Sequence, residues 1–189
     1  SKIDLLVGGD LLNQICISNY NAAKYRIPYL GVYSACASFI EGLIVSSTFI
    51  ESKQAKTVVN ITSSHNLNAE RQFRYPVEYG AIKKHTTTFT TTGACATLLT
   101  NEVTNIKIES ATIGKALDMG LNDANNMGAI MAPAAAETLV THLNEMKRNT
   151  SYYDLILTGD LGKVGKELFL EVLRQSHNIE LKKYIDAGC

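Results

Sequence analysis

Hydrophobic positions along the chain alternate between short continuous runs and helical spacing. The runs "IDLLVGGD" (3–10) and "IPYLGVY" (27–33) are typical of buried strands, and the segment between them (11–25) has the spacing of a helix. Residues 36–51 again follow a helical pattern, and the β-branched run "TVVNITSS" (57–64) predicts a third strand. Strands that alternate with helices predict an α/β fold with mostly parallel pairing.

The second part of the chain has a similar pattern. Two segments rich in threonine and isoleucine, 86–100 and 105–114, predict adjacent strands, whereas the aromatic and charged stretch before them is expected to be a loop. Residues 132–149 predict an amphipathic helix with Pro133 in its first turn. A strand (153–160) and a helix (161–176) follow, and the chain ends on "YIDAGC".

An internal repeat links the two parts. "IDLLVGGDLLNQI" at residue 3 and "YDLILTGDLGKVG" at residue 153 share an aspartate, an apolar run and the sequence Gly-Asp-Leu before a helix. Cys189 also follows Asp160 at about the distance at which Cys36 follows Asp10. Two matches in the same order indicate a duplicated unit.

Composition limits the class of protein. The 189 residues are 46% hydrophobic and 19% charged with no net charge, so neither nucleic acid nor an anionic membrane is favoured as a partner. No run of apolar residues is long enough to span a bilayer. The chain opens on Ser1 and enters a strand at once, which suggests a fragment of a longer chain.

Four cysteines stand at positions 16, 36, 95 and 189. None forms a Cys-x-x-Cys pair, so we expect neither a zinc site nor a thioredoxin-like motif. Their wide spacing in an apolar chain is typical of reduced cytosolic thiols, most of them small core residues.

Cys36 differs because it stands where a strand passes into a helix. The helix 36–51 is apolar nearly all round and is therefore expected to be buried, while Ser38, Gly42 and Ser46 form a small-residue stripe suited to a close helix contact. The N-terminal end of a helix favours an anion, either a thiolate or a ligand carboxylate. The alternative is that Cys36 is only a small buried residue.

Three segments together resemble a known family. "VYSACASFIEGL" resembles the thiolase-like superfamily, in which this cysteine is the acylated nucleophile of condensing enzymes. With "ITSSHNLNAERQFRYPVEYG" and "TTTGACATLL" it resembles, more closely, the stage V sporulation protein AD family of spore-forming bacteria. The resemblance implies a thiolase-like α/β fold of duplicated βαβ units, with mixed sheets and buried helices. Residues 1–130 would form most of the first half with an insert loop, and 131–189 the start of a truncated second half.

The resemblance also implies a function. Its members bind dipicolinic acid (pyridine-2,6-dicarboxylate) and take part in its uptake into the developing spore and its release at germination. The expected partners are the other membrane proteins of the stage V sporulation A operon and a second copy of the chain. The expected location is the cytoplasmic face of the spore inner membrane, reached through partners because no transmembrane segment is predicted.

Condensation chemistry needs a histidine besides the cysteine, to polarise the thioester and handle protons. In ketosynthase-like enzymes a His-Gln-Ala-Asn motif follows the strand of the second half, but here Thr158, Gly159 and Asp160 occupy that place. His142 and His177 are expected to be structural or solvated. The sequence therefore predicts a retained pocket without catalysis. The alternatives are an acyltransferase that uses Cys36 and a purely structural scaffold.

Candidate ligand-binding residues gather where parallel strands end, because open α/β sheets bind ligands at that edge. Ser34 and Cys36 end one strand. Ser63, Ser64 and His65 end the next, although the same three residues are also typical of a turn stabilised by local hydroxyl bonds. Thr92 and Gly93 interrupt the threonine-rich strand.

Charged residues near this edge have two interpretations each. Arg74, with Arg71 and the tyrosines around it, suits a carboxylate, but such a loop is also typical of a surface or subunit contact, which we favour. Asp10 and Asp160 would repel a dicarboxylate, so they are expected to cap the following helices. If either touches the ligand, Ca²⁺ is expected to accompany it; no other cofactor or metal is predicted.

Overall fold

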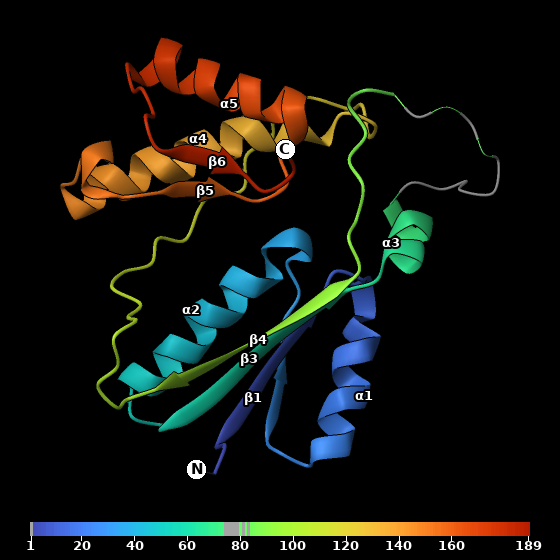
Figure 1. Ribbon diagram of the computed structural model, residues 1–189, viewed down its shortest axis with the longest axis vertical. Helices are drawn as coiled ribbons and strands as arrows, with labels where there is room; N and C mark the ends of the chain where they lie inside the picture. The colour runs from blue at the N-terminus through green and yellow to red at the C-terminus, as the bar shows by residue number, and fades with distance from the viewer. Residues whose placement is uncertain (1, 74–79, 81, 83) are drawn as a thin grey trace. The chain divides into compact units, whose positions relative to one another are not determined.

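The computed structural model describes residues 2–73, 80, 82 and 84–189. The chain forms two compact units (Figure 1). Unit 1 comprises Ser1–Gly80 and Phe89–Glu109, and unit 2 comprises Ala81–Thr88 and Ser110–Cys189. These units are defined by packing, whereas the boundary at 130/131 divides the sequence repeat and stays a prediction.

Unit 1 contains a four-stranded sheet in the order β2-β1-β3-β4 (Figure 1). Strands β1 (Leu5–Asp10), β2 (Tyr29–Gly31) and β3 (Thr57–Ser64) are parallel, and β4 (Gly93–Thr100) runs antiparallel to β3. The β-branched run 57–64 thus forms the predicted strand with its predicted bounds. The carboxyl ends of the three parallel strands meet at one edge of the sheet, which we call the carboxyl edge.

The pleat of β1 separates two helices. Helix α1 (Cys16–Tyr25) lies on the face toward which Gly8 points, because a Cβ on Gly8 would lie 3.3 Å from Ser18 Cβ. Helix α2 (Ser38–Glu51) lies on the opposite face, where a Cβ on Gly9 would lie 3.0 Å from Ser38 Cβ. Successive strand residues point to opposite faces, so every residue of β3 and β4 can be assigned to one of them.

The α2 face contains the core of unit 1. Its buried residues are Val7, Val32, Ala55 and Val58, with Val45 and Phe49 of α2 packed against them. The small-residue stripe on α2 is the buried side of the helix. We expected it to contact a second helix, but in the described part of the chain it packs against the sheet. Other apolar side chains of α2 remain partly or largely uncovered; Ile40 is 54% exposed. The expectation of an all-round buried helix is therefore wrong for the described residues.

Three other expectations, for residues between 66 and 114, are corrected. Residues 86–92 are not strand, and β4 begins only at Gly93. Residues 105–114 form no strand; their β-branched composition favours an extended chain, but a strand needs a paired neighbour. Within the predicted loop, Asn66–Phe73 forms helix α3. Two short 3-10 turns, Asn13–Ile15 and Ala35–Ala37, lie directly before α1 and α2.

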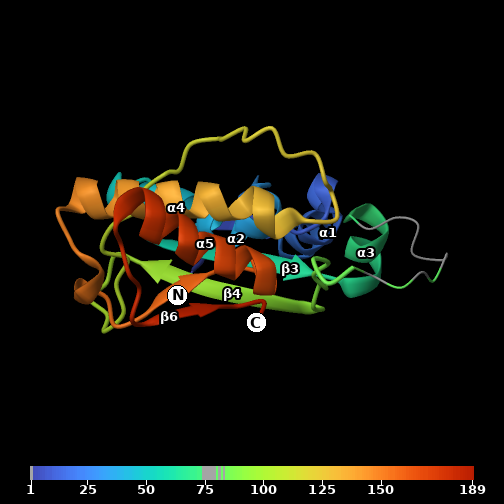
Figure 2. The same cartoon turned by 90° about the horizontal axis from the view of Figure 1, so that it is seen from above.

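Unit 2 packs two helices against a two-stranded parallel sheet (Figures 1 and 2). Its elements are α4 (Met127–Met146), a 3-10 turn (Thr150–Tyr152), β5 (Ile156–Thr158), α5 (Gly162–His177) and β6 (Tyr184–Asp186). Helix α4 begins five residues earlier than predicted, so Pro133 lies inside it and leaves one backbone carbonyl without its helical partner.

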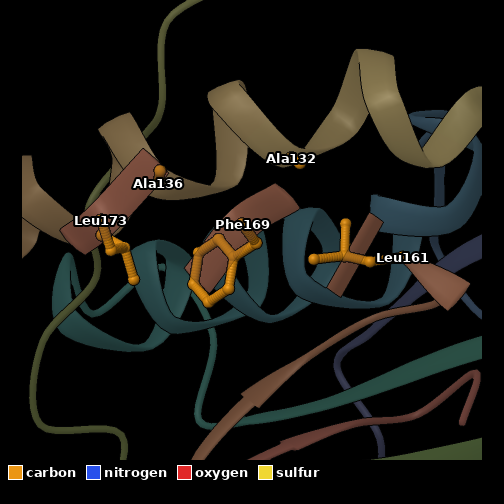
Figure 3. Packing of buried hydrophobic residues seen from close by; sticks show 5 residues of the cluster. All are labelled: Ala132, Ala136, Leu161, Phe169 and Leu173. Carbon is orange, nitrogen blue, oxygen red and sulfur yellow. The ribbon is translucent and has the colours of Figure 1, made fainter. Parts of the chain in front are cut away.

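The core of unit 2 lies between α4 and α5 (Figure 3). Figure 3 shows Ala132 and Ala136 of α4 facing Phe169, Leu173 and Leu161 of the α5 region. Small residues on α4 let the helices approach closely. At the closest point Gly128 meets Gly165, where a Cβ on Gly128 would lie 2.8 Å from the Gly165 nitrogen. No helix in the described part of the chain is long and apolar enough to cross a membrane.

The sequence repeat appears in the pairing register. Leu6 pairs with Tyr29 and Gly8 with Gly31 in unit 1, while Ile156 pairs with Tyr184 and Thr158 with Asp186 in unit 2. In both pairs a tyrosine begins the second strand. The residue two positions later is paired with Gly8 in unit 1 and with Thr158 in unit 2. The two units therefore share one β-helix-β arrangement, as the duplicated sequence predicts.

Candidate functional site

The carboxyl edge of unit 1 brings the end of β1 against the start of α2. The Ser34 backbone N–H donates to Ser38 Oγ over 3.0 Å, and Ser38 in turn donates to the Ala35 carbonyl over 2.8 Å. Gly9 lies directly below Ser38, with the Val32 carbonyl and the Thr62 methyl group on either side. These contacts place Ser34 and the turn that contains Cys36 on the α2 face of the sheet.

Cys36 is exposed, as are Cys16, Cys95 and Cys189, and the four form no disulfide. The expectation that most of these cysteines are core residues is therefore wrong. Cys36 is exposed because it lies in the turn at the carboxyl edge of the sheet. Cys95 is exposed because it lies on β4, the outer strand. An exposed sulfur at the start of a helix remains compatible with a ligand contact.

Asp10 and Ser63 form a pair on the opposite, α1 face. Ser63 Oγ donates to Asp10 Oδ2 over 2.8 Å, and the Leu12 N–H donates to Asp10 Oδ1 over 2.8 Å. Asp10 is fully buried, and its carboxylate bonds to the turn after β1 and not to the first N–H groups of α1, whose N-cap is Ile15. Burial, and secondly the nearby Asp10 charge, raise the pKa of Tyr29, whose hydroxyl is buried on this face.

Ser64, Thr92 and Gly93 meet at the other end of the edge. Ser64 pairs with Gly93 in the β3–β4 ladder, and Ser64 Oγ donates to the Thr91 carbonyl. Thr92 Oγ1 accepts from the Asn66 N–H over 2.9 Å. The threonine-rich segment therefore folds back over the start of α3, which explains why it is not a strand.

Helix α3 holds this segment in place. Asn66 Nδ2 donates to the Thr90 carbonyl over 2.7 Å, and the Thr90 N–H donates to Glu70 Oε1 over 3.2 Å. His65 precedes α3 with an exposed side chain, and its carbonyl accepts from the Ala69 N–H. Arg74 lies outside the described residues, so its predicted role is not addressed by the structure.

Unit 2 uses a different carboxylate at the equivalent helix start. Asp186, 1% exposed, accepts hydrogen bonds from Thr158 Oγ1 (2.6 Å) and from the backbone N–H groups of Leu161, Gly162 and Gly188 at 3.0 to 3.1 Å. It thus caps α5, a role that we expected of Asp160. Slight loss of solvent around the exposed Cys189 thiol, and secondly the Asp186 charge, raise its pKa.

A cavity of about 480 Å³ opens in unit 2 between α4, β5 and residues 110–112. Its walls are mostly apolar, with hydroxyls and His142 as the polar groups, and no charged side chain lines it. His142 is not isolated: Nδ1 lies 2.9 Å from Thr112 Oγ1 and Nε2 lies 2.7 Å from the Tyr153 hydroxyl. This supports the structural role that we expected for His142, and the uncharged cavity does not suit a dianion.

Metal-binding groups do not cluster within the described residues: no three His, Cys, Asp or Glu side chains are arranged to hold an ion there.

Comparison with known proteins defines the class first. OleA of Xanthomonas campestris with lauric acid and lauroyl-CoA superposes with a TM-score of 0.69 at 14% identity, over 100% of this chain and 62% of that one. A 3-oxoacyl-[acyl-carrier-protein] synthase III from Aquifex aeolicus VF5 gives 0.64 at 16% identity, over 97% and 61%. The chain therefore has a thiolase-like α/β fold.

The family follows from the sequence. Residues 1–189 match the family described as Stage V sporulation protein AD. Stage V sporulation protein AD of Bacillus subtilis (strain 168) is 44% identical over 186 residues, which are 98% of this chain and 55% of that protein. The chain belongs to the stage V sporulation protein AD family, and it spans about half the length of this curated relative.

Sequence reasoning missed two features of the site. Helix α3 is short and mostly polar and lies in a segment expected to be a loop; Asn66 and Glu70 on it bond to Thr92 and Thr90. Asp186 lies 24 residues along the chain from Gly162, where the helix that it caps begins, so only the β5–β6 pairing brings it there. By register Asp186 corresponds to Gly31 of the first unit, which has no carboxylate, so the repeat carried no signal for this cap.

Proposed function

We propose that the full-length protein binds dipicolinic acid without catalysis and takes part in its uptake into the developing spore and its release at germination. The observation that carries the proposal is membership of the sporulation family over the whole chain. The ligand itself is what the family resemblance implies. Hydroxyl groups at the carboxyl edge support it, because a carboxylate needs hydrogen-bond donors.

Calorimetry on the full-length protein with millimolar dipicolinate tests this proposal. We expect a saturable heat with one ligand per chain. Pyridine, which has the ring without the carboxylates, is the matched control and should give no heat. No heat with dipicolinate would favour the scaffold alternative, in which the inherited fold only holds membrane partners together.

The second candidate is a condensing-type acyltransferase with Cys36 as nucleophile. The solved structures that share the fold are condensing enzymes, and the Cys36 sulfur is exposed at the start of the α2 region. The end of β5 argues against this candidate. Thr158 bonds there to Asp186, and the sequence that follows has no histidine at the place where condensing enzymes need one. Incubation with acyl-CoAs and intact mass measurement separates the two, since an adduct that survives Cys95→Ala but not Cys36→Ala would favour the enzyme.

The proposed setting is the cytoplasmic face of the spore inner membrane, as a peripheral protein held by the other membrane proteins of the stage V sporulation A operon. We also propose a homodimer. The ligand is the only small molecule required, and Ca²⁺ enters with it if Asp10 or Asp160 contacts the bound dicarboxylate. Spore fractionation before and after loss of the operon's membrane proteins tests the location, because the protein should become soluble without them.

A further inference from the structure

The pleat of the sheet divides the candidate binding residues between two faces. Pairing places Asp10 opposite Ser63 and Gly9 opposite Thr62 in the parallel β1–β3 ladder. Residues opposite one another share a face, and their neighbours point the other way. Gly9 faces α2, so Thr62 and Ser64 lie on the α2 face with Ser34, whereas Ser63 lies on the α1 face with Asp10.

Hydrogen-bond accounting separates these hydroxyls further. A hydroxyl has one proton to donate, and a carboxylate ligand only accepts. The protons of Ser63 and Ser64 are already donated, to Asp10 Oδ2 and to the Thr91 carbonyl. Among the described residues, neither the Thr62 hydroxyl nor the Ser34 hydroxyl has a hydrogen-bond partner, so both protons remain available to a ligand.

Thr62 and Ser34 are both near Ser38 at the start of α2. A Cβ built on Gly9 would be 3.0 Å from Ser38 Cβ and 3.3 Å from Thr62 Cγ2, so Ser38 and Thr62 lie on either side of Gly9. Ser34 is tied to Ser38 by a hydrogen bond of 3.0 Å. Gly9 carries no side chain where Ser38, the Val32 carbonyl and the Thr62 methyl group already lie close, and this lets Thr62 and the start of α2 approach each other at the end of the strand where ligands bind in open sheets.

We infer that Thr62, with Ser34, donates to the ligand's carboxylates on the α2 face, and that Ser63 bonds to Asp10 on the other face and does not contact the ligand. This inference rests on the proposed function. It adds Thr62 to the site and removes Ser63 from direct contact. The negative charge of Asp10 then points away from the dianion, on the far side of the sheet from α2.

The test measures dipicolinate affinity by calorimetry on full-length variants. Thr62→Val keeps the shape and the strand preference of the side chain and removes only the hydroxyl. We expect Thr62→Val and Ser34→Ala each to weaken binding at least tenfold, the range for a hydrogen bond to a charged group. Thr62→Ser should stay within about threefold of the wild type, because the donor is kept.

Two controls separate contact from positioning. Thr97→Val makes the same change on the α2 face of β4, beside Asn60 and away from the carboxyl edge, and should bind as the wild type does. Ser63→Ala should change affinity by less than about threefold, since its proton is donated to Asp10. Urea unfolding of each variant reports any loss of folded protein.

Affinity in Thr62→Val within twofold of the wild type would overturn the inference, and so would a Ser63→Ala loss as large as that of Thr62→Val. Either result leaves the proposed function intact, because the wild type still binds. A wild type that binds no dipicolinate refutes the proposed function and this inference together, so the two failures are distinguishable.

Discussion

Gly42 is the residue at which α2 comes closest to the sheet. The side chain of Asn60, fully buried on β3, fills the space beside it and donates through Nδ2 to the Phe39 carbonyl over 3.1 Å. A Cβ on Gly42 would overlap Asn60 Oδ1. The small-residue stripe is therefore explained by a buried amide on the neighbouring strand, which the sequence of α2 alone does not reveal.

Gly42→Ala is expected to destabilise the protein by about 1–3 kcal/mol, the usual effect of overpacking a close contact. Gly93→Ala is the matched control in the same unit, since no atom lies within 4 Å of its added methyl group. Urea unfolding measures both. Equal stability of the two variants would show that α2 can move away from Asn60 at no cost.

Asp186→Ala should be more harmful, because it leaves the Thr158 hydroxyl and the first N–H groups of α5 without their acceptor. We expect a loss of at least about 3 kcal/mol, since several buried donors lose a charged partner. Asp154→Ala removes an exposed carboxylate bonded to Lys183 and should cost less than about 1 kcal/mol. Thermal unfolding of the two variants side by side tests this difference.

At the level of elements, β1 begins with a connection that depends on pH. The backbone N–H groups of Lys56 and Thr57 donate to Asp4 Oδ2 over 2.9 and 3.1 Å, and these bonds lower the pKa of Asp4. Because the folded pKa lies below the unfolded one, the ionised carboxylate favours folding. This contribution is complete above the unfolded pKa and is lost as pH falls through the folded pKa.

We therefore expect Asp4→Ala to be less stable than the wild type at pH 7, and the difference to narrow as pH falls below about 4. Unfolding by urea between pH 3 and pH 7 measures it. A difference that stays constant over this range would mean that the charge of Asp4 contributes nothing.

Strands with strong local signals were predictable, and their faces were not. The β-branched run 57–64 and the apolar run of β1 specify strands by themselves. Which of Ser63 and Ser64 faces α2 depends on the register with β1 and on the place of Gly9, and these are long-range contacts. Residues 105–114 have a strong β preference but form no strand, because no neighbouring strand in the described part of the chain pairs with them.

For the whole molecule, β4 is the outer strand of its sheet, and Leu98 on it is 58% exposed. An outer strand of eight residues without charge or proline is a ready surface for pairing with another strand. If the proposed homodimer forms there, Leu98→Lys should convert the full-length dimer to a monomer in light scattering. Leu157→Lys, an equally exposed leucine in unit 2, should leave the dimer intact.

The contact of Gly128 with Gly165 has a mechanical consequence for unit 2. With no side chains between them, α4 and α5 touch backbone to backbone just after the turn that Asp186 caps. A larger residue at either position would push α4 and α5 apart and change the angle of α5. A larger residue on α4, remote in sequence from Asp186, would then shift the start of α5 that this carboxylate holds, and no change at Gly165 could compensate, because glycine is already the smallest residue.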